Sequence, residues 1–115
     1  MSFMLLIVEP PGQRAARTEA EGRAAYDGML AFAADLQARG LLKAAESLQS
    51  PAVRVRTGAG RSQTLDGPFA EAKELIGGFF LIDCATREEA VAIARECPAA
   101  SWATVEVRAL GPCFT

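Results

Sequence analysis

The stretch DGPFAEAKELIGGFF, residues Asp66–Phe80, predicts a tight turn followed by a strand at the centre of a sheet. The turn follows from three side chains: Asp66 can bond the backbone two residues on, Gly67 accepts a positive φ, and Pro68 fixes the exit. The apolar run Phe79–Cys84 that follows is typical of a buried strand. A second strand is predicted at the other end of the chain, over the apolar residues Phe3–Val8.

Two helices are predicted between strands. Thr18 and Glu21 form a capping-box pattern at the start of the first helix, and Gly40 supplies its left-handed stop. Thr86 and Glu89 repeat the pattern for the second helix. Further strands are expected over residues 41–49 and 102–110, and a hairpin over 53–65 with its Gly-rich reversal at 57–62.

This order of elements predicts an α+β fold, a ferredoxin-like βαββαβ unit with an inserted hairpin and two helices on one face of an antiparallel sheet. The other sheet face has no third helix to cover it, so we expect a second copy, joined sheet to sheet as a twofold homodimer. Trp102, placed on the outer face of the last strand, is expected at that dimer interface. Residues 1–115 are expected to form one domain.

Composition excludes several classes of function. The formal net charge of −2 and the scattered basic residues argue against nucleic-acid binding. The chain has no histidine, which removes imidazole-based triads and metal sites, and no motif predicts a metal or a cofactor. Three widely spaced cysteines suit a reducing compartment, and no stretch reads as a membrane span, so a cytoplasmic location is expected.

The stretch DGPFAEAKELIGGFFLID resembles the signature of the DGPF subgroup of the YCII-related family of small bacterial proteins. FMLLIVE at the start, ARGLL at the end of the first helix, VRVR and the closing VEVR also match, so the resemblance covers nearly the whole chain. It implies a dimeric α+β barrel and, because some relatives are linked to extracytoplasmic-function sigma factors, a functional link to a sigma factor. A His–Asp dyad known in another branch of the family cannot be carried over, because this chain lacks histidine.

Charged residues near the turn and on the strands are the candidate site. Asp66, Lys73 and Glu74 are candidate catalytic residues: a carboxylate would act as general base, and the lysine would stabilise developing charge. The alternatives are a turn cap at Asp66 and a solvated or interchain ion cluster. The strand charges could bind an anionic molecule, pair across strands or face solvent. The candidate ligand-binding residues are Tyr26, Arg54, Arg56, Asp66, Phe69, Glu71, Lys73, Glu106 and Arg108.

Three functions remain open on the sequence. The first is a small-molecule-binding protein with a regulatory or accessory role, its ligand lying in a cavity near the DGPF turn. The second is a lyase- or isomerase-type enzyme that uses carboxylates in place of histidine. The third is an interaction module whose dimerisation is its function.

Overall fold

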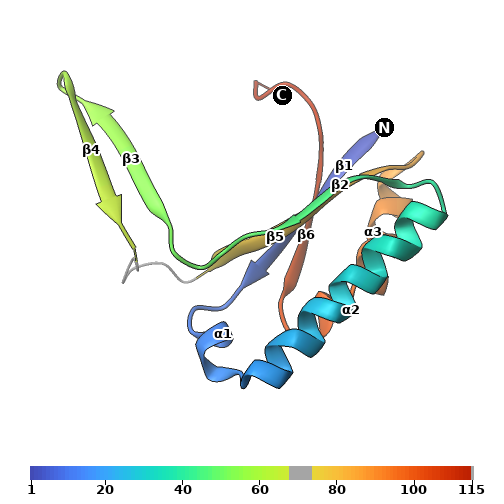
Figure 1. Ribbon diagram of the computed structural model, residues 1–115. Coiled ribbons are helices and arrows are strands. Elements are labelled where there is room, and N and C mark those ends of the chain that lie inside the picture. Colours follow the sequence, from blue (N-terminus) through green and yellow to red (C-terminus); the bar gives the residue numbers. More distant parts are fainter. Residues whose placement is uncertain (68–73, 115) are drawn as a thin grey trace.

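The computed structural model describes residues 1–67 and 74–114 as a four-stranded sheet, two packed helices and a separate two-stranded arm (Figure 1). The strands are β1 (Ser2–Glu9), β2 (Leu42–Ser47), β3 (Val53–Gly58), β4 (Arg61–Asp66), β5 (Leu75–Asp83) and β6 (Thr104–Ala109). The helices are α1 (Gln13–Ala16), α2 (Glu19–Ala38) and α3 (Arg87–Glu96), and the 3-10 turn η1 spans Pro98–Ser101.

The four strands of the main sheet lie in the order β2-β5-β1-β6, and each neighbouring pair is antiparallel. Two strands from different halves of the chain, β1 and β5, therefore occupy the centre, as in a ferredoxin-like fold. The β3–β4 pair is inserted between β2 and β5 as a hairpin. The predicted α+β class, the predicted order of strands and helices along the chain, and the inserted hairpin are confirmed.

The caps of α2 form as the sequence predicts. Thr18 Oγ1 accepts a hydrogen bond from the Glu21 amide at 3.1 Å, and the Thr18 amide donates to Glu21 Oε1 at 2.9 Å. At the other end Gly40 adopts φ 72°, a conformation that a residue with a Cβ rarely takes. The short helix α1, before this cap, was not predicted, because four residues are too few to show a helical period.

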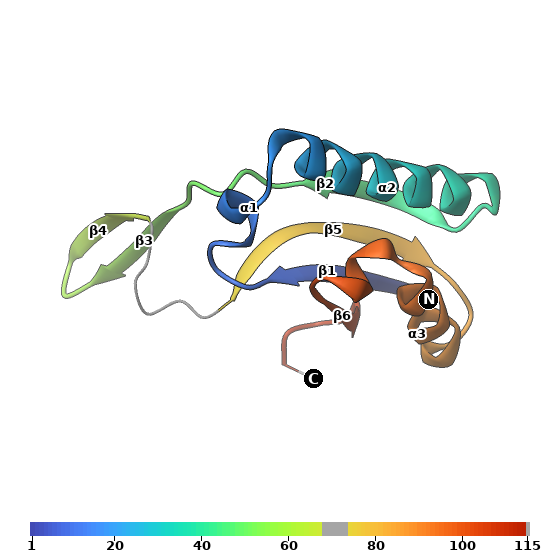
Figure 2. The ribbon, with the colours of Figure 1, turned by 90° about the horizontal axis from the view of Figure 1, so that it is seen from below.

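One sheet face and the two helices enclose the core (Figure 2). Phe3, Leu5 and Ile7 alternate along β1 toward the helices, as a period of two requires. Phe32 of α2 meets Phe80 of β5 edge to face, with ring centroids 5.1 Å apart. The second half of α2 and the inner side of α3 are thereby fixed against the sheet.

The opposite face of the sheet, called here the open face, is covered by no helix of the described residues. Met4, Leu6 and Val8 of β1 point to it, together with Phe79 and Leu81 of β5, and all five are only partly buried. This row of partly exposed apolar side chains is the surface through which the expected dimer would form.

The structure corrects the expected place of Trp102. η1 ends at Ser101 and β6 begins at Thr104, so Trp102 lies before the strand and does not share its alternation. Its ring lies on the helix side of the sheet, under the guanidinium of Arg17. The 3-10 turn η1 places Trp102 before β6, so its side chain does not follow the in-and-out alternation that the strand pattern predicted for it.

None of the helices in the described ranges combines the length and the apolar character that crossing a membrane requires.

Candidate functional site

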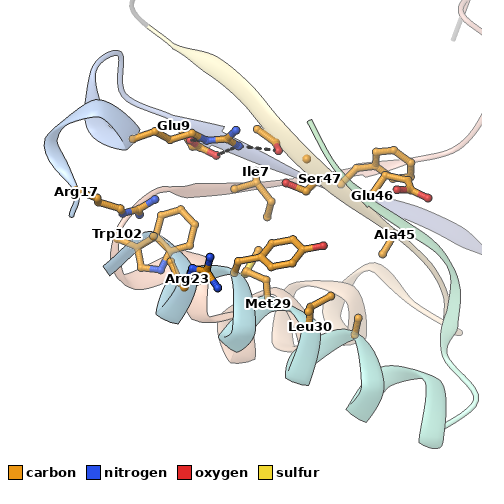
Figure 3. A pocket seen from close by; sticks show the side chains of 18 of the residues that line it. Ile7, Glu9, Arg17, Arg23, Met29, Leu30, Ala45, Glu46, Ser47 and Trp102 are labelled. Atoms are coloured by element: carbon orange, nitrogen blue, oxygen red, sulfur yellow. Dashed lines mark hydrogen bonds and ion pairs between the residues drawn. The ribbon is translucent and has the colours of Figure 1, made fainter. Parts of the chain in front are cut away.

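A cavity of about 610 Å³ lies between the first half of α2 and the sheet (Figure 3). Gly22, Ala25 and Ala33 of α2 leave space in it, although the larger Tyr26, Met29 and Leu30 of the same helix also line it. Phe32 and Leu36 of α2 are buried against the sheet. Helix and sheet are therefore in contact at one end of α2 and separated by a hollow at the other.

The sheet contributes small residues to the same hollow. Ala45 of β2 and the glycines Gly77 and Gly78 of β5 line it. The floor is apolar, with Ile7 and Phe80 from the central strands. An apolar floor with polar groups at its mouth is the usual character of a small-molecule site.

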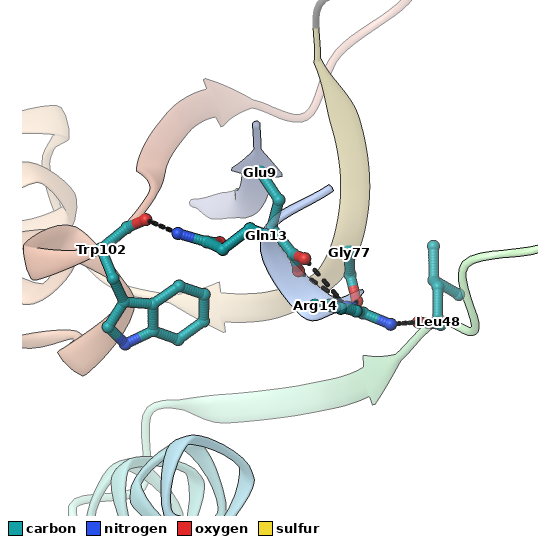
Figure 4. Close-up of polar contacts among 6 residues, drawn as sticks. All are labelled: Glu9, Gln13, Arg14, Leu48, Gly77 and Trp102. Atoms are coloured by element: carbon teal, nitrogen blue, oxygen red, sulfur yellow. Dashed lines mark hydrogen bonds and ion pairs between the residues drawn. The ribbon is translucent and has the colours of Figure 1, made fainter. Parts of the chain in front are cut away.

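Glu9 and Arg14 form one wall (Figure 4). Glu9 is 5% exposed, and Arg14 binds both of its oxygens, from Nε at 2.8 Å and from Nη2 at 2.9 Å. Arg14 also donates to the carbonyl oxygens of Leu48 at 2.5 Å and Gly77 at 3.0 Å. The buried charge is thus paired, and the pair ties the ends of β1, β2 and β5 together, which is a structural role.

Arg17 and Trp102 lie at the mouth of the cavity. The guanidinium carbon of Arg17 is 4.5 Å from the centre of the indole ring, within the range of a cation–π contact. Among the described residues no group accepts a hydrogen bond from Arg17, so its N–H groups remain available for another acceptor. Gln13 Nε2 donates to the Trp102 carbonyl oxygen at 2.5 Å and holds the backbone below the ring.

Two more polar groups border the mouth. Arg23 is exposed and is paired with Glu19 one turn earlier at 2.9 Å. Tyr26 lines the cavity with 52% of its surface exposed, so its phenol can meet both solvent and a ligand. Since Glu9 and Glu19 are already paired, Arg17 is the cation that the described cavity residues leave without a hydrogen-bonded partner.

The predicted site residues that the structure describes lie in four different places: the cavity, a second hollow, the β3–β4 arm and the open face. Tyr26 lines the cavity. Glu74 borders a shallower hollow of about 420 Å³ that also touches Trp102. Asp66 ends β4, is exposed and lines neither hollow, so the described structure does not bring the two carboxylates of the acid–base hypothesis together.

The strand charges are also separated from the cavity. Arg54 and Arg56 lie on β3, in the arm, while Glu106 and Arg108 lie on β6 opposite Leu6 and Met4 of the open face. Phe69, Glu71 and Lys73 lie outside the described residues.

Sequence reasoning missed Arg17, Trp102 and the Glu9–Arg14 wall as neighbours of a cavity. A partial signal was present in the small residues Gly22, Ala25 and Ala33, which share one face of α2 with the larger Met29 and line the cavity together with Ala45, Gly77 and Gly78 of the sheet. Nothing in the sequence shows that Arg17 reaches Trp102, 85 positions later, because that contact depends on how α1 and η1 meet. No group of three or more metal-binding side chains occurs within residues 1–67 and 74–114.

Fold and cavity together define a small α+β protein with a ligand-sized hollow under its first long helix. The YCII-related domain matches residues 1–113, and the chain belongs to the YCII-related family. A curated relative from Rhizobium meliloti (strain 1021), "Uncharacterized protein R00369", is 48% identical over 61 residues, 51% of this chain. The match spans about half (49%) of that relative's length.

Proposed function

We propose that this chain binds a small molecule with an anionic group and an apolar body in the cavity beneath α2, in a regulatory or accessory role. The observation that carries the proposal is Arg17, held over Trp102 at the mouth of an apolar hollow with its N–H groups unused by the described residues. A guanidinium in this position suits a carboxylate or a phosphate, because both accept two parallel hydrogen bonds from it.

The size and lining of the cavity support a small ligand. A volume of about 610 Å³ lies within the range of small-molecule pockets. The apolar floor would bury the body of the ligand, and Tyr26 at the rim offers a hydroxyl that donates or accepts. The acid–base alternative gains no such support, because Asp66 and Glu74 do not share a hollow.

We further propose that the functional unit is a homodimer joined through the open face. Its support is the row of partly exposed apolar residues on β1 and β5, which no described helix covers. Two such faces packed together would remove both rows from water.

The first experiment is native mass spectrometry of freshly purified protein, followed by a denaturing spectrum of the same sample. A mass lost on denaturation would identify a retained ligand. Binding is then measured through Trp102, the single tryptophan of the chain, whose fluorescence should change when the Arg17 guanidinium above it engages an anion.

The probes are benzoate and phenyl phosphate, with neutral benzyl alcohol as the matched control. Arg17→Gln should weaken binding of both anions about 10- to 100-fold, the value of a charged hydrogen bond, whereas Arg87→Gln on α3 should not. Equal binding of benzyl alcohol and benzoate, or unchanged binding by Arg17→Gln, would refute the anion site. Calorimetry measures benzoate binding to Trp102→Phe without fluorescence, and so distinguishes loss of the fluorescent reporter from loss of ligand binding.

A further inference from the structure

The β3–β4 hairpin, called here the arm, has both faces in solvent. Every residue of its two strands is exposed, including Val53 at 59%, Val55 at 65% and Leu65 at 46%. Its turn is well formed, since Ala59 and Gly60 have φ of 50° and 75°, as a two-residue hairpin loop of this type requires. An isolated two-stranded hairpin is at best marginally stable in water, so these apolar residues need a surface to pack against.

The molecule also has more surface than its mass requires. Its accessible surface is 8051 Å², whereas a compact monomer of this mass exposes about 6,100 Å². Its radius of gyration is 16.0 Å, against about 13 Å for a compact chain of this length. The excess is larger than the roughly 800 Å² per partner that a stable interface buries.

The arm rises on the side of the sheet that faces away from α2 and α3 (Figure 1). This is the side of the open face. A second copy seated on the open face would therefore lie beside the arm and could cover one of its two faces.

Charge favours a second copy as the occupant. From Val53 to Asp66 the arm carries three arginines and one aspartate, whereas the rest of the chain carries nine basic and thirteen acidic side chains. The open face itself carries Glu106 and Arg108 of β6, so the attraction lies between the arm and the body as a whole. A basic arm and an acidic body attract each other between copies of the same chain.

We propose that the arm clasps a second copy of this chain, so that the dimer is held by the arm as well as by the open face. The inference rests on the homodimer proposed above and adds to it a dedicated element and a charge pattern. Within one chain the arm extends away from the body, and only in the dimer is the face that carries Arg56 and Leu65 covered.

The matched variants are Arg56→Glu in the arm and Arg87→Glu on α3, both exposed arginines that change the net charge equally. The dimer dissociation constant is measured by sedimentation equilibrium. Arg56→Glu should raise it tenfold or more, and Arg87→Glu should leave it within twofold. Ligand binding is measured on the same samples with benzoate, so that loss of the cavity is distinguished from loss of the arm contact.

Hydrogen exchange tests the arm without any substitution. The amides of 53–66 should exchange rapidly in dilute protein and become protected as the concentration passes through the dimer dissociation constant. A dimer that Arg56→Glu leaves unchanged, with arm amides that stay unprotected, overturns the arm contact and leaves the open-face dimer standing. A chain that is monomeric at 100 µM overturns both, and an arm protected in the monomer shows that it packs on its own chain.

Discussion

Gly77 stands where a side chain has no room. It lies in an irregularity of the β1–β5 register, between Ile76 and Gly78, and a Cβ there would overlap Glu9 Oε2 and lie 2.8 Å from Arg14 Nη2. These atoms belong to flexible side chains, but Arg14 donates hydrogen bonds both to Glu9 and to backbone carbonyl oxygens, so neither side chain can move without breaking the wall.

Gly77→Ala should therefore lower the free energy of unfolding by about 2–3 kcal/mol, the cost of overpacking together with disturbance of a buried ion pair. Gly22→Ala is the control, because nothing lies within 4 Å of its added Cβ and alanine favours a helix. Urea denaturation measures both. A Gly77→Ala protein as stable as wild type would show that the Glu9–Arg14 pair is dispensable.

The three cysteines differ in exposure. Burial raises the pKa of the Cys97 thiol above its ordinary value of 9.0, and burial likewise raises that of Cys84, whereas Cys113 is exposed. At pH 8 one thiol per native chain should react rapidly with Ellman's reagent, because burial reduces both the access of the reagent to the other two thiols and the fraction of them that is thiolate. All three thiols should react after denaturation. Rapid reaction of two thiols in the native protein would contradict the burial of the core pair.

The same shift predicts a dependence of stability on alkaline pH. A raised native pKa stabilises the protein below the unfolded thiol value, and this contribution is lost as the pH rises through the native value. Stability measured by urea denaturation should therefore decline above pH 9, and Cys97→Ala, although less stable at neutral pH, should show a flatter decline. An equally steep decline in that variant would assign the effect to another group.

At the scale of elements, the cap of α2 links folding to the candidate site. Thr18 and the first turn of α2 line the cavity, so the cap positions the residues at its mouth. The hydrogen bond from the Thr18 amide lowers the pKa of Glu21 from its ordinary 4.5, with a further contribution from the charge of Arg17. The Glu21 carboxylate of the capping box therefore stabilises the fold at pH values above its ordinary pKa. This stabilisation is lost as the pH falls through the lowered pKa of the folded protein.

Thr18→Ala should cost about 1 kcal/mol of unfolding free energy and should also weaken benzoate binding. Thr86→Ala, at the matching cap of α3, removes a similar bond, which the Glu89 amide donates to Thr86 Oγ1, but Thr86 lies outside the cavity residues. It should lower stability by a similar amount and leave binding unchanged. Denaturation and Trp102 fluorescence separate the two effects, and equal loss of binding in both variants would argue against a local role for the α2 cap.

At the scale of the whole molecule, the basic arm and the acidic body predict a dimer that responds to salt. Contacts between exposed charges are screened as ionic strength rises, whereas apolar burial is not. Raising sodium chloride from 50 to 500 mM should weaken the dimer several-fold in sedimentation experiments. In Arg56→Glu the response should be smaller, and a dimer that tightens with salt would indicate an interface held by the open face alone.

Much of this architecture follows from local chemistry. Thr18, Gly40 and Thr86 mark helix ends through bonds and backbone angles that involve neighbours in sequence. The alternation of β1 and the turn at Ala59 and Gly60 are local in the same sense. The class and its four-stranded sheet with an inserted hairpin could therefore be predicted, and the resemblance to the YCII-related family pointed to the same fold.

The candidate site depends on contacts between distant segments. Arg17 meets Trp102, and Arg14 joins Glu9 to the carbonyls of Leu48 and Gly77, across separations that no periodicity reports. The charged residues that sequence reasoning favoured are spread over the arm, the open face and residues outside the described ranges.

By itself, then, the sequence determined the strands, the two capped helices and their order, because these follow from hydrogen bonds and hydrophobic periods a few residues long. It did not show α1 or the 3-10 turn η1, which sets the place of Trp102. Only the tertiary structure decided where the hollow lies and which cation borders it. Those depend on how far α2 stands from the sheet, and that distance is set by the sizes of side chains that meet from opposite ends of the chain.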